Sequence, residues 1–350
     1  MTIGFGIIGC GMIANFHAKA LADADGAKLV ACYARDLEKA KAFGEQHGIA
    51  CYDSIDALLA DPNVNAVSIC TPSGAHMEPA IAAAQAGKHV IVEKPLEITL
   101  ERCDAIIEAC KAAGVRLAVT FQSRFHQSAQ LIKKAVDEKR FGTLTMGDAY
   151  VKWYRTQAYY DSGAWRGTWK LDGGGALMNQ AIHTIDLLTW VMGPVSEITA
   201  TVGTLAHERI EVEDVAVATL RFANGALGVI EASTAAFPGS LKRIEISGTH
   251  GTAVLEEEDI KSWEFAEMTD EDRRIQKEML GQNKTGGGAA DPAAIGHHGH
   301  TMVFNDVARA ITTDTPLLID GTEGRRSVEI ILGIYEAAKT KQAVSLPLSG

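Results

Sequence analysis

One pattern repeats from the start of the chain to about Phe121: a short apolar run rich in Val and Ile, a turn, and an amphipathic stretch rich in Ala. Strands that alternate with helices form a parallel sheet, because each helix carries the chain back before the next strand begins. We therefore predict a doubly wound α/β domain over residues 1–122, whose ligands bind beyond the carboxyl ends of its strands. The predicted strands are residues 3–8, 28–33, 66–70, 89–92 and 116–121, and the predicted helices are residues 36–47, 74–86 and 100–113.

A different pattern follows residue 121. Polar and apolar residues alternate in five segments, and Asn224-Gly225 marks a turn between two of them, which is typical of antiparallel strands and a hairpin. We predict that residues 123–350 form an α+β domain with a large, open, mainly antiparallel sheet and helices on one face. The predicted strands are residues 143–153, 197–205, 215–222, 225–235 and 242–247, the predicted helices are residues 125–137, 176–191, 301–312 and 323–339, and the Gly-rich residues 282–288 are a predicted loop.

The net charge limits the class of partner, and the cysteine content bears on the redox compartment. The formal net charge of -11 argues against a nucleic-acid or anionic-membrane surface, since such surfaces are bound by Lys and Arg. No segment reaches the roughly 20 uninterrupted apolar residues that span a bilayer. The six cysteines all lie in the first third without a C-x-x-C pair, which favours reduced thiols in a cytoplasmic protein. We expect a small-molecule partner.

A glycine loop directly follows the first predicted strand. Gly9 and Gly11 belong to a G-x-G-x-x-A pattern that ends at Ala14 and opens a helix, with Met12 and Ile13 between. Glycines there permit a tight turn and a close approach of backbone amides to a pyrophosphate. In this strand-loop-helix setting we predict dinucleotide binding; the alternative is a purely structural glycine turn.

The end of the second predicted strand bears on the type of dinucleotide. Ala34 stands where an acidic residue would hold the ribose hydroxyls of NAD, and Arg35 follows it. A guanidinium can receive a 2′-phosphate, so we expect NADP(H) to be favoured over NAD(H). The alternative is that Arg35 is a solvated loop residue and Asp36 caps the next helix.

Lys94 is the leading catalytic candidate. It follows the strand at residues 89–92 in the motif Glu93-Lys94-Pro95, at the sheet edge where the cofactor would bind. A lysine there could hydrogen-bond a substrate hydroxyl beside the nicotinamide. The alternative is a surface lysine that pairs with Glu93.

Residues 86–95 closely resemble the signature of the glucose-fructose oxidoreductase, inositol dehydrogenase and rhizopine-catabolism family, Gfo/Idh/MocA. The resemblance spans the chain and includes the glycine loop, Thr71-Pro72 with His76, the E-K-P motif, and residues 173–177 leading to residues 183–186. It implies an NAD(P)-dependent sugar or polyol dehydrogenase or reductase without a metal. It also implies cofactor contacts from Thr71, Pro72, His76, Glu93 and Lys94, and a homodimer or homotetramer paired through the second-domain sheet.

The resemblance further implies that Lys94 assists proton transfer and that His183 is a general acid or base. Asn179 and His183 are four residues apart on a predicted helix, with Asp186 three further, so all three share roughly one face. Inositol dehydrogenase-like members carry an aspartate where this chain has Asn179. An amide can orient a substrate or ring but cannot take up a proton, so more of the proton transfer would fall to Lys94.

Aromatic and arginine residues between the two predicted domains are candidates for the substrate pocket. Tyr154, Trp165 and Arg166 stand out among them, because flat rings cover sugar faces and guanidinium groups bind hydroxyls or carboxylates. They could equally be core residues. Arg124 either lines the pocket with Asn179 and His183 or pairs with an acidic residue at the domain boundary.

Two further features have alternative interpretations. Asp172 could contact substrate or cap the following helix. The cluster His297-His298-Gly299-His300 resembles a metal site by composition, but no carboxylate or cysteine stands at a persuasive spacing, and we expect no metal.

The leading hypothesis is therefore an NAD(P)-dependent oxidoreductase acting on a sugar, inositol, sugar acid or nucleotide sugar. A noncatalytic NAD(P)-sensing regulatory protein is one alternative. A redox-cycling glycoside-modifying enzyme with retained cofactor is another.

Overall fold

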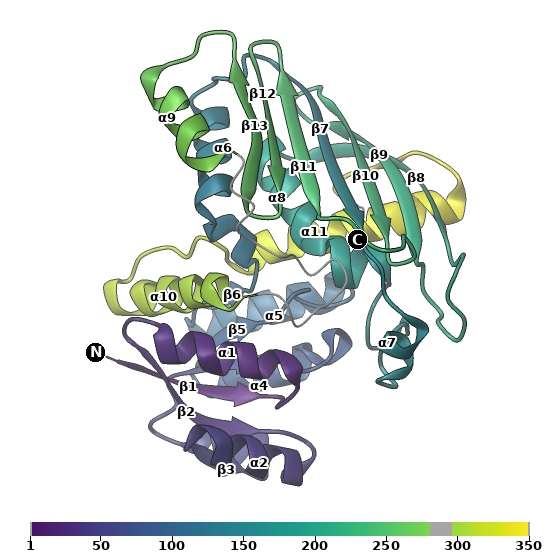
Figure 1. Ribbon diagram of the computed structural model, residues 1–350. Helices are drawn as coiled ribbons and strands as arrows, with labels where there is room; N and C mark the ends of the chain where they lie inside the picture. Colours follow the sequence, from purple (N-terminus) through teal and green to yellow (C-terminus); the bar gives the residue numbers. More distant parts are fainter. Residues whose placement is uncertain (1, 281–295, 349–350) are drawn as a thin grey trace. The chain divides into compact units, whose positions relative to one another are not determined.

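The computed structural model describes residues 2–280 and 296–348, which divide into two compact units (Figure 1). The first unit comprises Met1–Gln122 and Gly296–Val328, and the second comprises Ser123–Ile295 and Glu329–Gly350. The expected range 123–350 placed residues 296–328 in the second domain, whereas the structure places them in the first. The Gly-rich residues 282–288, expected to be a loop, lie outside the described residues.

The first unit is built on a six-stranded parallel sheet in the order β3-β2-β1-β4-β5-β6, which confirms the predicted doubly wound fold. Every residue of β1 is buried, as expected of a strand covered on both faces. The strands are β1 (Ile3–Ile8), β2 (Ala27–Tyr33), β3 (Ala50–Tyr52), β4 (Ala66–Ile69), β5 (His89–Val92) and β6 (Leu117–Val119). The helices are α1 (Met12–Asp23), α2 (Leu37–His47), α3 (Ile55–Ala60), the 3-10 turn η1 (Ser73–Ala75), α4 (Met77–Gln85), α5 (Leu100–Ala113) and α10 (His298–Thr313).

Residues 296–328 belong to the first unit because they bury apolar surface there. Helices α1 and α10 lie side by side (Figure 1), and the Phe304 ring of α10 packs edge-on against Phe5 of β1. Further along, the Val119 N–H donates to the Ile319 carbonyl at the end of β6. Apolar periodicity predicted the α10 helix but carried no information about which sheet it covers.

The second unit contains an eight-stranded sheet in the order β13-β12-β11-β7-β10-β9-β8-β14. The β10–β7 pair is parallel and the other described pairs are antiparallel, which confirms the predicted mainly antiparallel sheet. The strands are β7 (Leu144–Lys152), β8 (Val195–Gly203), β9 (Val215–Phe222), β10 (Leu227–Ser233), β11 (Arg243–Gly248), β12 (Gly251–Glu256), β13 (Asp259–Phe265) and β14 (Val344–Ser345). The helical segments are η2 (Gln122–Phe125), α6 (Gln127–Asp137), α7 (Gln157–Asp161), the π-helix η3 (Ala176–Ala181), α8 (Ile182–Met192), α9 (Asp270–Met279) and α11 (Gly321–Thr340), of which η2 and α11 continue from the first unit.

The two faces of the second sheet differ. Helix α8 packs on β7 and β11, and α6 packs beside α8 (Figure 1). Alternate residues of β9 are buried, and the residues between them are exposed. The exposed face carries apolar side chains, since Met146, Val217 and Leu227 are each close to half exposed, at 49%, 46% and 49%. Their strand partners place them on the same side of the sheet.

Residues 251–279 contain three elements that the sequence did not predict, namely β12, β13 and α9. Helix α9 is strongly polar, and only Asp272 and Ile275 are buried in it, so it lacks the apolar stripe that marks a helix. It is instead fixed at its start, where Thr269 and Asp272 form a capping box.

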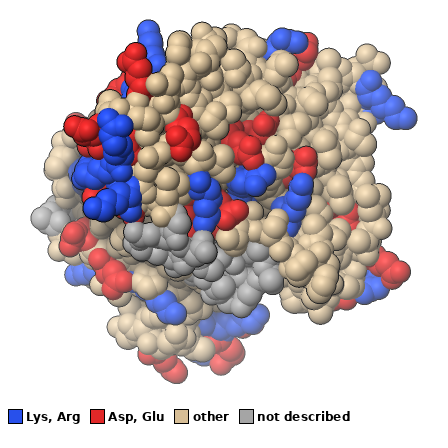
Figure 2. Space-filling view, turned by 45° about the horizontal axis from the view of Figure 1, so that its top comes forward, with Lys and Arg blue, Asp and Glu red and all other residues tan. Residues whose placement is uncertain are grey.

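Charged side chains of both signs lie on the surface. On the face shown in Figure 2, acidic and basic side chains are intermingled among larger uncharged areas. Among residues 2–280 and 296–348, no helix combines the length and apolar character that crossing a membrane requires.

Candidate active site

The glycine loop has the geometry of an anion cradle. Gly9 has a φ of 100°, and a Cβ there would lie 2.8 Å from the Cys70 carbonyl oxygen, so no other residue fits without strain. Gly11 is the N-cap of α1, provides no side-chain cap, and faces open space where a Cβ would stand. The first N–H groups of a helix have no partner within it, and the first turn of α1 holds no acidic side chain. The backbone at Gly9, Gly11, Met12 and Ile13 is therefore suited to hold a pyrophosphate.

The end of β2 lies beside this loop, since the Gly9 N–H donates to the Tyr33 carbonyl at 2.8 Å. Ala34 is the first residue after β2, and Arg35 follows it with an exposed side chain. Asp36 is the N-cap of α2 and accepts hydrogen bonds from two backbone N–H groups. Its carboxylate is thus committed to the helix, which leaves Arg35 as the charged side chain next to Ala34.

His76 links the loops that follow β4 and β5. It is 1% exposed, with Nε2 3.0 Å from the Thr71 carbonyl oxygen and Nδ1 2.9 Å from the Pro95 carbonyl oxygen. Burial lowers the pKa of His76, so the ring is neutral at pH 7 and donates to one of the two carbonyls. The sequence placed Thr71, Pro72 and His76 at the cofactor. In the structure the His76 imidazole lies within hydrogen-bond distance of the backbone of both loops.

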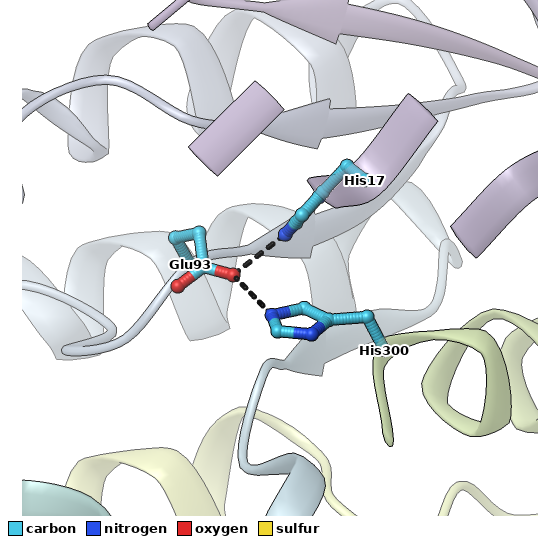
Figure 3. Close-up of side chains that lie close together, drawn as sticks. All are labelled: His17, Glu93 and His300. Carbon is cyan, nitrogen blue, oxygen red and sulfur yellow. Dashed lines mark hydrogen bonds and ion pairs between the residues drawn. The ribbon is translucent and has the colours of Figure 1, made fainter. Parts of the chain in front are cut away.

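Glu93 is buried, and its carboxylate points toward His17 and His300 (Figure 3). Oε1 lies 2.6 Å from Nε2 of His17 on α1, and Oε2 accepts the Lys94 backbone N–H at 3.2 Å. Nε2 of His300 on α10 is 3.6 Å from the same Oε1. Glu93 was expected at the cofactor. In the structure it binds His17 and the Lys94 backbone, a role that its sequence motif did not indicate.

His17 was not singled out from the sequence. It is 0% exposed on the apolar face of α1, and a histidine among buried alanines and leucines was the one available signal. Burial opposes a charge on His17, but its contacts with Cys70 and Glu93 outweigh this effect and raise its pKa to about 10. Burial raises the pKa of Glu93, yet its bonds to His17 and His300 leave it well below the usual value. The two groups form a buried ion pair at neutral pH.

The histidine cluster near residue 300 separates in the structure. His297 pairs with Asp23 at 2.7 Å, whereas His300 turns to Glu93. His17, Glu93 and His300 each offer one ligand atom within 4.8 Å of the others, a grouping that could hold a metal ion. An ion there would have to replace the 2.6 Å hydrogen bond between His17 and Glu93.

In the second unit, Asn179 is held by a polar network. It lies in the π-helix η3, a rare conformation that is frequent at functional sites. Its Nδ2 donates to Asp172, and its Oδ1 accepts from Gln180 Nε2 at 2.9 Å. The other Asp172 oxygen accepts the Gly167 N–H at 2.8 Å. Gly175, not Asp172, is the N-cap of η3, so Asp172 orients the Asn179 amide rather than capping the helix.

His183 and Asp186 lie on α8. His183 is half-buried and lines a small open depression together with Ser123, Lys242 and Glu257. Asp186 is 0% exposed and receives two hydrogen bonds from Arg124, at 2.7 and 2.8 Å. Arg124, expected either in the pocket or in an ion pair, thus forms the ion pair.

Of the aromatic and arginine candidates, Tyr154, Trp165 and Arg166 remain partly exposed. The Arg166 guanidinium stacks over the rings of Tyr159 and Trp165, at 4.2 and 4.6 Å. Arg155 is buried and donates to Gln180 Oε1 at 3.0 Å, which connects this cluster to the Asn179 network.

Trp153 and Tyr160 are buried, at 5% and 6% exposure. These two rings are core residues, which is the alternative the sequence left open.

Glu213 is a further buried acid that the sequence did not single out. Its carboxylate accepts the backbone N–H groups of Gly175 and Leu177 at 3.0 and 2.8 Å, and the Tyr335 hydroxyl at 3.1 Å. It therefore fixes the start of η3, which carries Asn179. Burial raises the pKa of Glu213 to about 7, although the backbone hydrogen bonds oppose this shift.

Comparisons with known protein families agree with this geometry. Residues 3–121 match the family model described as an oxidoreductase family with an NAD-binding Rossmann fold, and residues 129–254 match the GFO/IDH/MocA C-terminal domain. The chain is 35% identical over 251 residues to myo-inositol 2-dehydrogenase from Thermotoga maritima, covering 70% of this chain and 73% of that protein.

Solved structures resemble the chain over nearly its whole length. The WlbA dehydrogenase from Bordetella pertussis, in complex with NADH and UDP-GlcNAcA, is 37% identical with a TM-score of 0.90 and covers 99% of both chains. A levoglucosan dehydrogenase, in complex with NADH and levoglucosan, is 26% identical with a TM-score of 0.86, covering 99% of this chain and 100% of the other. These findings confirm the resemblance read from the motifs.

Proposed function

Because the chain belongs to the Gfo/Idh/MocA family of NAD-binding oxidoreductases, we propose that it moves a hydride between a nicotinamide and a carbon of a sugar, inositol, sugar acid or nucleotide sugar. The observation that carries the proposal is the position of Lys94. It lies two residues after the end of β5, at the same sheet edge as the glycine loop that follows β1, because the strands of this sheet are parallel. Ligands of doubly wound sheets bind at this edge.

The chain's own residues then have separate tasks. Backbone amides at Gly9 and Gly11 would hold the pyrophosphate of the dinucleotide, whose nicotinamide supplies the hydride acceptor or donor. When a CH–OH group is oxidised, the hydride leaves its carbon and the hydroxyl proton must leave its oxygen. We propose that Lys94 takes that proton and that His183 is a second proton carrier.

Asn179 has an orienting task in this proposal. Asp172 and Gln180 hydrogen-bond the nitrogen and the oxygen of its amide, so the orientation of the amide plane is fixed. An amide cannot carry a proton in turnover, so the proton path depends on Lys94 and His183.

A substrate panel tests the proposal. Its compounds are chosen from the relatives, which include proteins in complex with UDP-GlcNAcA or levoglucosan and an inositol dehydrogenase. We expect oxidation of at least one of UDP-GlcNAcA, levoglucosan, myo-inositol and common aldoses, measured as NAD(P)H formation. Tight cofactor binding with no turnover of any of them would favour the noncatalytic sensing protein. Substrate conversion with retained cofactor and little net NAD(P)H would favour the redox-cycling enzyme.

We propose that NADP(H) is favoured over NAD(H), although the WlbA and levoglucosan dehydrogenase complexes contain NADH. Ala34 offers no carboxylate to repel a 2′-phosphate, and the exposed Arg35 can receive one. Fluorescence titration of both cofactors tests this, with Ala34→Asp as the matched variant that should weaken NADP(H) binding specifically. Tighter NAD(H) than NADP(H) binding by the unaltered chain would refute it.

We also propose a cytoplasmic homodimer or homotetramer that pairs through the exposed face of the second sheet. The apolar side chains of Met146, Val217 and Leu227 on that face support this, because such residues are typical of a covered surface. Light scattering should give a multiple of the chain mass, and Val217→Lys should lower it. A monomer at micromolar concentration would contradict the proposal.

A further inference from the structure

The buried carboxylate of Glu93 connects three parts of the first unit. It touches His17 on α1 at 2.6 Å and His300 on α10 at 3.6 Å (Figure 3). It also accepts the backbone N–H of Lys94 at 3.2 Å. Both histidine rings point toward the same carboxylate oxygen. The residue next to the proposed catalytic lysine is therefore fixed from two helices.

His17 is itself held on both sides. Its Nδ1 lies 2.7 Å from the Ser68 hydroxyl on β4 and 3.5 Å from Cys70 Sγ, while Nε2 meets Glu93. Since α1 begins directly after Gly11, the His17–Glu93 contact ties the helix of the cofactor loop to the end of β5. An imidazole bonded at both nitrogens has little freedom to rotate.

The charges in this cluster balance. The carboxylate of Glu93 and the imidazolium of His17 are opposite, and burial lowers the pKa of His300, which keeps that ring neutral. Nδ1 of His300 has no hydrogen-bond partner among the residues that the structure describes. One positive and one negative charge thus lie together beside the backbone of Lys94.

We propose that His17 is a positioning residue for Lys94, acting through Glu93. This inference rests on the proposed dehydrogenase function, in which Lys94 handles the substrate proton. By pairing with Glu93, His17 holds the backbone at Lys94 in a fixed position relative to α1. It also neutralises a carboxylate that would otherwise attract the Lys94 ammonium and turn it away from the substrate.

A displacement of about 1 Å of a reacting group can cost about 100-fold in rate. We therefore expect His17→Gln to lower kcat by about 10- to 100-fold, with the dissociation constant of the cofactor changed by less than about threefold. The double variant His17→Gln with Glu93→Gln should be faster than His17→Gln alone, because two neutral amides can hydrogen-bond without an unpaired charge.

Phe304→Leu is the matched control. The Phe304 ring packs edge-on against His17 at 5.4 Å, so this variant disturbs the same core without removing the ion pair. The two variants are compared at an equal loss of thermal stability. If kcat falls no further in His17→Gln than in Phe304→Leu, His17 has only a structural role and the proposal is wrong.

A second measurement does not depend on turnover. Trace acetylation over a pH series, read by mass spectrometry, gives the titration of individual lysines. An unpaired carboxylate favours the charged ammonium, so His17→Gln should move the Lys94 profile upward by about half a pH unit or more. Lys88 on the same segment, which bonds the carbonyls of Asp61 and Val64, should not move.

The two measurements separate the possible failures. An unaltered chain that turns over no sugar, but shows the Lys94 shift in the variant, would refute the proposed function and leave the positioning role intact. Normal turnover in the unaltered chain, with no Lys94 shift in the variant, would refute the positioning role.

Discussion

Replacing Glu213 by glutamine should change how stability depends on pH. Glu213 is 3% exposed, and burial raises its pKa from 4.5 to about 7. The folded chain therefore binds this proton more tightly than the unfolded chain, so the unfolding free energy falls as pH rises from about 4.5 to about 7. The size of that fall is about 3 kcal/mol at 1.36 kcal/mol for each pKa unit. Glutamine does not titrate, so the variant should lack this fall.

The assay is chemical unfolding of Glu213→Gln and of the unaltered chain between pH 5 and pH 8. The quantity compared is the difference between their unfolding free energies at each pH. Glutamine loses one of the acceptor contacts to Gly175 and Leu177, but this cost is nearly constant with pH and cancels in the comparison. Glu211→Gln is the control, since its side chain lies on the same segment but is exposed. Hydrogen exchange in residues 173–185 should show whether the change is local to η3. Parallel stability curves for Glu213→Gln and the unaltered chain would refute the assigned ionisation of Glu213.

Four further substitutions test other parts of the structure. Lys94→Ala should lower kcat by about two to four orders of magnitude in steady-state kinetics, because it removes the proposed acid-base group, and near-normal turnover would remove Lys94 from the mechanism. Asp186→Ala removes the carboxylate that pairs with the buried Arg124 guanidinium and should cost about 3–5 kcal/mol in chemical unfolding; a loss below about 1 kcal/mol would contradict the buried pair. Gly9→Ala introduces a Cβ at a φ of 100° and should weaken cofactor binding by about tenfold or more in a fluorescence titration. Gly11→Ala, where no atom lies within 4 Å of the added Cβ, should weaken binding without lowering thermal stability, and equal destabilisation by both alanines would refute the distinction.

The sequence was sufficient for the features that depend on short stretches of chain. The apolar run of β1, the glycines at residues 9 and 11, and the position of Lys94 just after β5 all follow from local patterns. Such patterns record which face of an element is buried and where the backbone must turn. They predicted the parallel sheet, the mainly antiparallel sheet and the family.

Partners that are distant in the chain were decided by the tertiary structure. His17 meets Glu93 across 76 residues, Arg124 meets Asp186 across 62, and Gly175 meets Glu213 across 38. A polar residue has the same local signature whether it faces water, a ligand or a buried partner. For this reason the sequence left Arg124 with two interpretations and gave no role to His17.

The course of the chain after residue 295 shows the same division. Apolar periodicity predicted a helix over residues 301–312, and α10 is there, but only packing against α1 decided that it belongs to the first unit. The π-helical turn at Asn179 likewise depends on contacts that Asp172 and Glu213 make from outside the helix. Local pattern determined the elements and the loop that suits a dinucleotide. Burial and long-range hydrogen bonds decided which side chains hold Lys94 and Asn179 in place, because those interactions exist only once distant segments have packed together.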